Sequence, residues 1–277
     1  MDGKFSFFFP PITNTSPNMT LSLEEVWRFI KGEDILVVKK KGSPIGTLEQ
    51  VTNIVRAVRD FSPEKYNSKT EGKVSFLPLV TFGGTFSRRG VDGLEETSGL
   101  VNLDIDHISS LGLSLEDLKE RLSKDREIGV RLLFTSPSGD GLKIVCKTSG
   151  QITDGESYRG EFERLQYFVS QKYSIPIGEE GLDKGISDIS RGCLLCHDPH
   201  SVLCVDGGIF DSESHPLPER EERDTAYRNE VDSSDFDFIE GRLIPAMFER
   251  VDEIFPEMQF RWNRNKWESP FKLDGSP

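Results

Sequence analysis

Residues 99–147 contain two segments that decide the fold, G-L-V-N-L-D-I-D-H-I (99–108) and L-L-F-T-S-P-S-G-D-G-L-K-I-V-C-K (132–147). Because side chains alternate between the two faces of a strand, Asp104 and Asp106 are predicted to stand side by side on one face. The opposite face is apolar and consists of Val101, Leu103 and Ile105. Two adjacent carboxylates repel each other unless a cation or a proton lies between them. The first segment therefore predicts a metal or proton-sharing site, with the polar face of an edge strand as the alternative.

The second segment turns through S-P-S-G-D-G-L-K (136–143), which brings hydroxyls, glycine-flanked backbone amides and one ammonium group together. Groups of these kinds hold phosphate oxygens in proteins. The G-x-x-x-x-G-K-[ST] spacing of a Walker loop is absent, so the turn taken alone is a weak signal. The candidate nucleotide-binding residues of this turn are Ser136, Ser138, Gly139, Gly141 and Lys143.

A divalent cation would connect these two segments chemically. Mg²⁺ and Mn²⁺ prefer carboxylate oxygens and substrate phosphates as ligands. An ion held by two or three aspartates can activate a hydroxyl group and neutralise a leaving pyrophosphate. We expect Mg²⁺ or Mn²⁺ on Asp104 and Asp106, and either Asp183 or Asp188 as the source of the third carboxylate. Arg191, in the same segment, is a candidate for binding a triphosphate.

The composition of the 277 residues is that of a globular protein, with 35% hydrophobic and 29% charged residues and a formal charge of −13. Residues 211–240 hold 11 acids and 3 bases, a net of −8, which leaves −5 for the rest of the chain. This balance argues against a broad, sequence-independent grip on nucleic acid, while a groove can still be locally positive. The four cysteines are too few for a disulfide framework, and no stretch approaches the roughly 20 apolar residues that span a bilayer. We expect a cytoplasmic protein without a membrane partner.

Local patterns predict the secondary structure. Helices are expected from apolar residues at helical spacing, at 22–32, 47–61, 114–124 and 156–173, with a capping box at Ser22 and a capping residue at Ser114. Strands are expected at 35–38, 74–79, 99–106, 131–135, 142–147 and 192–196. The Gly83-Gly84 pair before Arg88 and Arg89 is either an anion-binding loop or only a turn.

The order of these elements predicts three regions. Residues 1–207 are expected to form a single core. Residues 208–235, which are acidic and contain Pro216 and Pro218, are expected to form a linker. Residues 236–277 are expected to form a helical extension that is the start of a further module.

The cluster C-L-L-C-H-D-P-H (193–200), with Cys204 nearby, contains the ligand types of a zinc site. If residues 192–196 form a strand, however, the Cys193 and Cys196 side chains point to opposite sides. We therefore favour buried, apolar cysteines at these positions.

Five segments carry a family resemblance when they are taken in this order. They are L-P-L-V-T-F-G-G-T-F (77–86), S-G-L-V-N-L-D-I-D-H (98–107), S-P-S-G-D-G-L-K (136–143), L-D-K-G-I-S-D-I-S-R (182–191) and C-H-D-P (196–199). The set resembles the VirE N-terminal domain family, whose core is similar to the archaeo-eukaryotic primases (primase-polymerases). The resemblance covers about residues 75–205. It implies an α+β fold with a primase-polymerase-like core, in which an RRM-like antiparallel sheet packs with an N-terminal α/β unit.

The resemblance also implies roles for particular residues. The first primase motif, D-x-D, corresponds to Asp104 and Asp106, and the third corresponds best to Leu182-Asp183. The second motif ends in a histidine in the family, whereas Lys143 stands at that place here. Lysine binds phosphate as a point charge rather than as a ring, so this difference leaves catalytic competence open. The implied partners are nucleoside triphosphates, a single-stranded DNA template and a downstream helicase-like or replication module.

Three functional hypotheses follow. The first is a metal-dependent nucleotidyltransferase of primase-polymerase type, with Asp104, Asp106 and Asp183 as catalytic residues, that acts in replication of a mobile element. The second is a catalytically inactive nucleotide- or DNA-binding module of the same fold. The third is a metal-dependent phosphodiesterase that uses the same carboxylates.

Overall fold

The structure is a computed structural model that describes residues 3–33, 36–183, 188–217, 261–263 and 266–268. The chain divides into two compact units, Met1–Leu217 and Pro218–Pro277. The described part of the first unit contains two larger antiparallel sheets, two two-stranded hairpins and several helices, so the protein is of mixed α and β structure, as expected.

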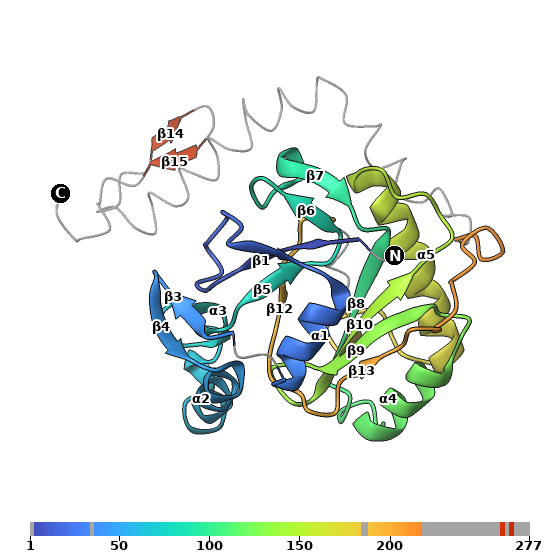
Figure 1. The fold of residues 1–277 in the computed structure, drawn as a ribbon. Helices are drawn as coiled ribbons and strands as arrows, with labels where there is room; N and C mark the ends of the chain where they lie inside the picture. The colour runs from blue at the N-terminus through green and yellow to red at the C-terminus, as the bar shows by residue number, and fades with distance from the viewer. Residues whose placement is uncertain (1–2, 34–35, 184–187, 218–260, 264–265, 269–277) are drawn as a thin grey trace, which may run out of the picture. The chain divides into compact units, whose positions relative to one another are not determined.

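A five-stranded antiparallel sheet forms the centre of the first unit, in the strand order β11-β8-β10-β9-β13 (Figure 1). Its strands are β8 (Leu100–Asp106), β9 (Val130–Thr135), β10 (Gly141–Lys147), β11 (Gly181–Leu182) and β13 (Val202–Leu203). Helix α4 (Leu115–Lys124) connects β8 to β9, and α5 (Gly155–Tyr173) connects β10 to β11. The chain therefore runs β-α-β-β-α-β through the first four strands of this sheet. Since β8 pairs on both sides, the alternative of an edge strand is wrong.

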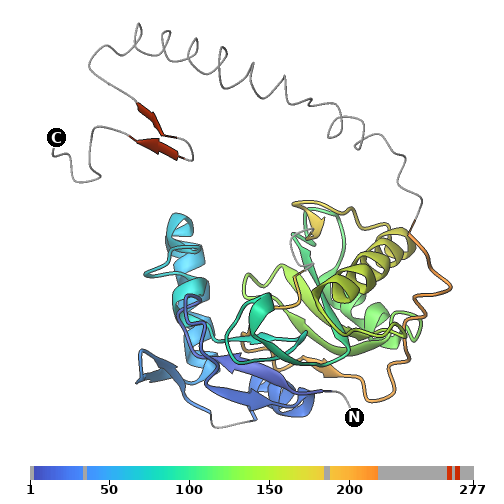
Figure 2. The ribbon, with the colours of Figure 1, turned by 90° about the horizontal axis from the view of Figure 1, so that it is seen from above.

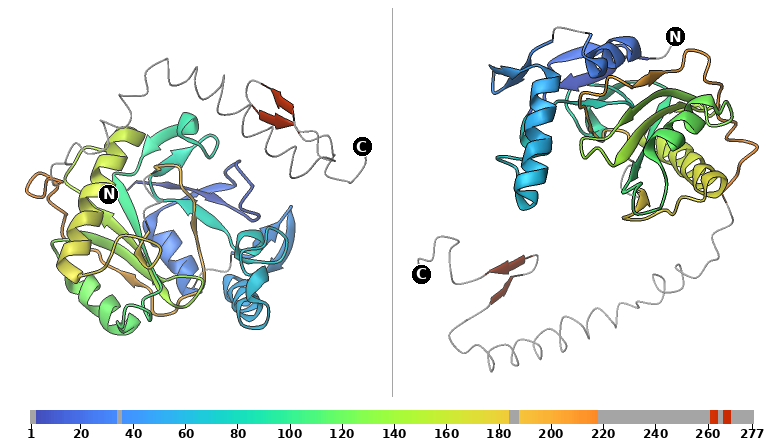
Figure 3. Two further views of the ribbon diagram at one scale, coloured as in Figure 1. Left: turned by 180° about the vertical axis from the view of Figure 1, so that it is seen from behind. Right: turned by 90° about the horizontal axis from the view of Figure 1, so that it is seen from below.

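One face of this sheet packs against α4 and α5, which lie next to each other in both views of Figure 3. The apolar residues of β8 that were predicted to share a face, Val101, Leu103 and Ile105, are fully buried in this core. They pack in one cluster with the inner side chains of α5, which are Tyr158, Phe162, Leu165 and Val169. Full burial of each aliphatic side chain contributes roughly 1.5–3 kcal/mol. The other face of β8 therefore carries Asn102, Asp104 and Asp106.

A second, four-stranded sheet has the order β12-β5-β1-β2. Its strands are β1 (Phe5–Phe8), β2 (Met19–Leu21), β5 (Leu79–Thr81) and β12 (Cys193–Leu194). Apolar residues of this sheet share a core with side chains from the acidic side of the five-stranded sheet, namely Leu100, Leu132, Phe134 and Val145. The two sheets are thereby joined, and the acidic face of β8 is turned toward the N-terminal part of the chain.

Helix α1 (Leu23–Lys31) confirms the capping box predicted at Ser22, and α2 (Leu48–Phe61), predicted from helical spacing, begins at a further capping box formed by Thr47 and Gln50. Ser22 Oγ accepts a hydrogen bond from the Glu25 amide, and the Glu25 carboxylate accepts one from the Ser22 amide. Such reciprocal caps are local interactions, which is why the sequence alone predicts them well. Figure 2 shows that α2 projects from the rest of the unit.

The smaller elements are the hairpins β3 (Val38–Lys40) with β4 (Ser43–Gly46) and β6 (Gly84–Phe86) with β7 (Leu94–Thr97), and the 3₁₀ turns Pro63–Lys65 and Val91–Gly93. The strand predicted at 35–38 thus begins at Val38 and runs into the lysines that follow it. The strand predicted at 192–196 is limited to β12.

The strand predicted over residues 74–79 is wrong. Residues Lys73–Phe76 form the short helix α3, closed by a hydrogen bond from the Leu77 amide to Lys73 O, and β5 begins only at Leu79. Pro78 has no amide hydrogen to donate to a ladder, so pairing starts after it. The helix brings Lys73 and Val74 to the wall of a cavity, where a strand would have placed them differently.

The first unit ends at Leu217 and not at residue 207. Phe210 is fully buried, forms a β-bridge with Thr148 and packs against Phe168, with the two rings tilted by 47° and their centroids 5.3 Å apart. The start of the predicted acidic linker therefore packs on the core. Of the predicted extension 236–277, the structure describes an antiparallel pair, β14 (Arg261–Asn263) with β15 (Lys266–Glu268). The helix predicted within residues 236–255 lies outside the described residues.

None of the helices in the described part of the chain is long and apolar enough to cross a bilayer.

Candidate functional site

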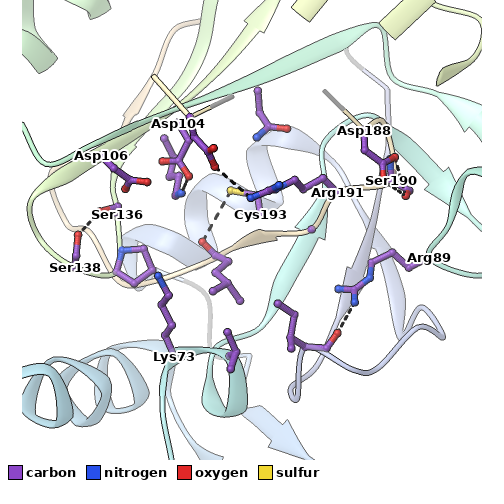
Figure 4. A pocket seen from close by; sticks show the side chains of 18 of the residues that line it. Lys73, Arg89, Asp104, Asp106, Ser136, Ser138, Asp188, Ser190, Arg191 and Cys193 are labelled. Atoms are coloured by element: carbon purple, nitrogen blue, oxygen red, sulfur yellow. Dashed lines mark hydrogen bonds and ion pairs between the residues drawn. The ribbon is translucent and has the colours of Figure 1, made fainter. Parts of the chain in front are cut away.

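A cavity of about 570 Å³ lies between the acidic face of β8 and the N-terminal part of the first unit (Figure 4). One wall comes from the five-stranded sheet and the turn after β9. The other comes from α3, the loops around Ile12 and Arg89, and the segment that leads into β12. Its charged side chains within the described residues are four acids and four bases, namely Asp104, Asp106, Asp183, Asp188, Lys73, Arg89, Lys143 and Arg191.

Three of these acids converge. Asp104, Asp106 and Asp183 each present a carboxylate oxygen, and these three atoms lie within 4.8 Å of one another. Asp183 directly follows β11, where Leu182 is paired with Ile105 of β8. The Asp183 amide donates a hydrogen bond to Asp104 O at 3.0 Å, which extends this pairing by one residue. Strand pairing therefore brings a distant acid to the D-x-D pair.

Asp188 lines the same cavity but is not part of the convergent group. Its carboxylate accepts hydrogen bonds from the Ser190 amide at 2.8 Å and from Ser190 Oγ at 3.0 Å. Its carbonyl accepts a hydrogen bond from the Arg191 amide. Asp188 therefore stabilises the turn that leads to β12. Of the two candidates that the sequence left open, the structure brings Asp183 to the β8 pair.

Lys143 lies directly opposite Asp104 in the ladder between β10 and β8. Its Nζ forms an ion pair with Asp104 Oδ2, and the two side chains are only 14% and 9% exposed. Burial lowers the pKa of Lys143. The other oxygen, Asp104 Oδ1, is buried and has no hydrogen-bond partner among the described residues. Because an unsatisfied buried polar atom is unfavourable, Oδ1 marks a position where an added ligand would be stabilised.

Asp106 lies at the end of β8, with Gly141 of β10 on one side and Gly181 of β11 on the other. Burial raises the pKa of Asp106, the nearby charge of Lys73 opposes this rise, and Asp183 adds to it. Burial in turn lowers the pKa of Lys73. Figure 4 shows Lys73 projecting from α3 toward the acidic group. No local sequence signal points to Lys73, because its position depends on α3 and on how the N-terminal part packs.

Two arginines complete the basic part of the wall. Arg191 Nη2 lies 3.2 Å from Asp183 Oδ2. Arg89 donates a hydrogen bond to Ile12 O, and burial lowers its pKa. The glycine pair before Arg89 serves packing instead, because a Cβ on Gly83 would lie 2.4 Å from Ile189 O. Of the proposed anion-binding loop, Arg89 is therefore the residue that reaches the cavity.

The turn after β9 contributes hydroxyl groups. Ser136 and Ser138 line the cavity, with their Oγ atoms 2.8 Å apart. Arg59 Nη1, on α2, donates a hydrogen bond to Ser138 O at 2.6 Å and holds the turn in place. Gly139 has a φ of 78°, and its amide donates to Ser136 O at 2.9 Å. Gly139 and Gly141 are not among the residues that line the cavity, and the Gly139 amide donates its hydrogen bond within the turn.

Glycine is favoured at positions 139 and 141 for different structural reasons, and one substitution at each position can distinguish them. A Cβ on Gly141 would lie 2.6 Å from Ile105 O and 2.8 Å from Ser136 Oγ. We expect Gly141→Ala to destabilise the fold by about 1–3 kcal/mol, measured by urea denaturation, because β10 and β8 must move apart. Gly139→Asn is the control, since space there is open and asparagine tolerates a positive φ. Equal losses in the two variants would contradict this interpretation.

The cysteines of the 193–200 cluster are part of the packed interior. Cys193 and Cys196 are buried, and burial raises the pKa of the Cys196 thiol to about 12. Cys196 Sγ lies 3.1 Å from Thr135 O. In the part of the chain that the structure describes, the potential metal ligands that converge are Asp104, Asp106 and Asp183.

Asp198 has a structural role that the sequence did not predict. Its Oδ2 forms an ion pair with Lys119 Nζ of α4 at 2.6 Å and accepts a hydrogen bond from the Thr135 amide at 2.7 Å. Its Oδ1 accepts a hydrogen bond from the His200 amide. Burial alone would raise the pKa of Asp198, but these contacts outweigh it and lower the pKa. The residue joins α4, the end of β9 and the 196–200 turn.

No curated protein and no solved structure matches the chain. Residues 73–202 match the family described as BT4734-like, N-terminal domain. This description names neither VirE nor primases, so the resemblance to those families stays a prediction. The matched segment contains the three convergent aspartates, Lys143 and Arg191. The acidic and basic groups of the cavity thus belong to a region that is similar to the BT4734-like N-terminal domain.

Proposed function

We propose that the cavity is a divalent-metal-dependent nucleotidyl-transfer site of primase-polymerase type, in a protein that acts in replication of a mobile element. The observation that carries this proposal is the convergence of Asp104, Asp106 and Asp183 beside the unsatisfied Asp104 Oδ1. The β-α-β-β-α-β order of the five-stranded sheet agrees with the RRM-like core that the sequence resemblance implies. A primase-polymerase fold is the finer assignment that we propose on this basis.

The donor set of the site fits Mg²⁺ or Mn²⁺. These ions prefer oxygen ligands, and one carboxylate oxygen each from Asp104, Asp106 and Asp183 would hold one. Cys193 also lines the cavity, but burial raises the pKa of its thiol, which disfavours thiolate ligation of a softer metal. When bound, such an ion supplies Lewis-acid activation of a hydroxyl group and neutralises charge on a leaving group.

The rest of the wall is suited to a triphosphate. Ammonium, guanidinium and hydroxyl groups bind phosphate oxygens by charge-assisted hydrogen bonds. Lys73, Arg89, Arg191, Ser136 and Ser138 supply these groups around the acids. We therefore propose nucleoside triphosphates as the substrate class. A single-stranded DNA template and a downstream helicase-like or replication module are the proposed partners.

The test uses the double variant Asp104→Asn with Asp106→Asn. Asparagine keeps the shape of the side chain and an acceptor for Lys143 but removes the charge that holds a cation. We expect Mn²⁺-dependent incorporation of nucleotides on a primed single-stranded template to fall to background. Asp60→Asn, on the exposed side of α2, is the matched control and should keep the wild-type rate. Incorporation by the double variant at the wild-type rate would contradict the proposal.

A nucleotide-binding module without turnover is the second candidate. It is favoured by the ion pair of Lys143 with Asp104, which occupies one oxygen of the D-x-D pair at the place where the resembling family has a histidine. Calorimetric binding of a nucleoside triphosphate with Mn²⁺, without incorporation in the extension assay, would support this candidate. Cleavage of an oligonucleotide in the same mixture would instead indicate a phosphodiesterase.

A further inference from the structure

Each acid of the convergent group has a cation of the chain beside it among the described residues. Lys143 is ion-paired with Asp104, Arg191 lies 3.2 Å from Asp183, and the charge of Lys73 acts on Asp106. Among the described residues that line the cavity, four formal negative charges face four positive ones. The described part of the cavity wall is thus formally neutral, in a chain whose formal charge is −13.

The Lys143 pair differs from the Arg191 pair in how firmly it is fixed. Lys143 is directly opposite Asp104 in the β8–β10 ladder, and its side chain is 14% exposed. The Arg191 side chain is 45% exposed and its partner Asp183 is 32% exposed, so water screens that pair more strongly. Lys143 is therefore the cation that most strongly opposes a second positive ion at Asp104.

A balanced, partly buried site has little attraction for a bare divalent ion. Entry of the ion alone would leave two uncompensated positive charges in a cavity where charge is poorly solvated. In the complex of a divalent ion with a triphosphate, the ion meets the aspartates while the phosphate oxygens meet the cations that the aspartates release, so both sets of side chains keep counter-charges. The charge pattern therefore distinguishes the metal–phosphate complex from the free metal.

We propose, on the basis of the function proposed above, that this site takes its divalent cation as a complex with a triphosphate and binds the free ion weakly. Lys143 is the positioning residue for this selectivity. It holds Asp104 Oδ2, leaves Oδ1 without a hydrogen-bond partner among the described residues, and places a positive charge beside the aspartate group. The ligand class is a divalent metal complex of a triphosphate anion.

The experiment measures Mn²⁺ binding to the full chain by electron paramagnetic resonance, with and without inorganic tripolyphosphate. The affinity of Mn²⁺ for tripolyphosphate in solution is determined separately and taken into account. For the wild type, we expect tripolyphosphate to tighten Mn²⁺ binding by about tenfold or more, within the usual range of coupling between two ligands. For Lys143→Gln, we expect free Mn²⁺ to bind about tenfold more tightly, and the effect of tripolyphosphate to shrink correspondingly.

Lys124→Gln is the matched control, because Lys124 is an exposed lysine of α4 that is paired with Glu120 outside the cavity. It should bind Mn²⁺ as the wild type does, with the same response to tripolyphosphate. Equal affinities of wild type and Lys143→Gln for free Mn²⁺ would overturn the inference. Absence of Mn²⁺ binding in every variant, with or without tripolyphosphate, would instead contradict the proposed function itself.

A second variant keeps the test decisive if Lys143→Gln does not fold, which circular dichroism would reveal. Lys143→Arg keeps the positive charge opposite Asp104 and should keep both the weak binding of free Mn²⁺ and the response to tripolyphosphate. Tight binding of free Mn²⁺ by Lys143→Arg would overturn the assignment of the charge as the cause.

Discussion

Asp183→Asn is expected to abolish Mn²⁺ binding in the presence of tripolyphosphate and Mn²⁺-dependent incorporation, whereas Asp188→Asn is expected to bind Mn²⁺ under the same conditions as the wild type does. The Asp183 carboxylate is one of three oxygens that lie within 4.8 Å of one another, and its charge is needed to hold a cation there. The Asp188 carboxylate accepts hydrogen bonds from Ser190, and an asparagine oxygen can accept them as well. Electron paramagnetic resonance of Mn²⁺ and the extension assay measure the two effects.

The two substitutions are matched, since each replaces a cavity-lining aspartate in the same segment by its amide. Both variants should remain folded, with a thermal unfolding midpoint near that of the wild type. A much lower midpoint would reveal that a variant has lost its fold. Strong Mn²⁺ binding by Asp183→Asn, or its loss in Asp188→Asn, would show that the wrong acid has been assigned to the cation.

Asp198→Ala is expected to lower the free energy of unfolding by about 3–5 kcal/mol, the usual result of removing one partner of a buried ion pair. The side chains of Asp198 and Lys119 are 5% and 10% exposed. Removal of the carboxylate leaves the Lys119 ammonium buried without a counter-charge, and the Thr135 and His200 amides lose their acceptor. Such a loss is a large share of the 5–15 kcal/mol that typically stabilises a domain. Urea denaturation at neutral pH measures it.

Helix α4 also provides the control for this experiment. Lys124 and Glu120 form an ion pair on its exposed surface, with side chains 72% and 64% exposed. Exposed pairs of this kind contribute little, so Lys124→Ala should unfold at nearly the wild-type urea concentration. A loss for Asp198→Ala as small as that for Lys124→Ala would contradict the structural role of Asp198.

The effect of Asp198 should depend on pH in a defined direction. Its contacts lower the pKa in the folded protein below the ordinary value of 3.8. A carboxyl group with a lowered pKa contributes stability above its ordinary pKa and loses that contribution as the pH falls through the folded-state pKa. The difference in stability between wild type and Asp198→Asn should therefore be constant near neutral pH and shrink below about pH 4. Urea denaturation at a series of pH values tests this, and a difference that grows on acidification would contradict it.

Short-range patterns predicted much of the first unit. The start of α1 follows from the capping box at Ser22, which involves residues three positions apart, and α2 follows from apolar residues at helical spacing after Thr47. The bounds of β8 and β10 follow from alternation and from the turn between β9 and β10. Each of these features depends on a few neighbouring residues, so no knowledge of the rest of the chain is needed.

The errors lie where distant parts of the chain meet. Residues 73–76 have an apolar pattern that suits a strand, yet they form α3, and Lys73 reaches the cavity through it. Phe210 stands in a stretch with the composition of a linker, but its burial against Phe168 keeps the chain on the core to Leu217. Composition and periodicity do not report such long-range contacts.

The sequence by itself determined that Asp104 and Asp106 share a face of one strand, because alternation is a property of the extended backbone. It also determined that hydroxyls and a lysine follow in the next hairpin. Only the tertiary structure decided that Asp183 rather than Asp188 joins them and that Lys143 is paired with Asp104. Both results depend on the register of β8 against β11 and β10, which is set by strand pairing between residues far apart in the chain.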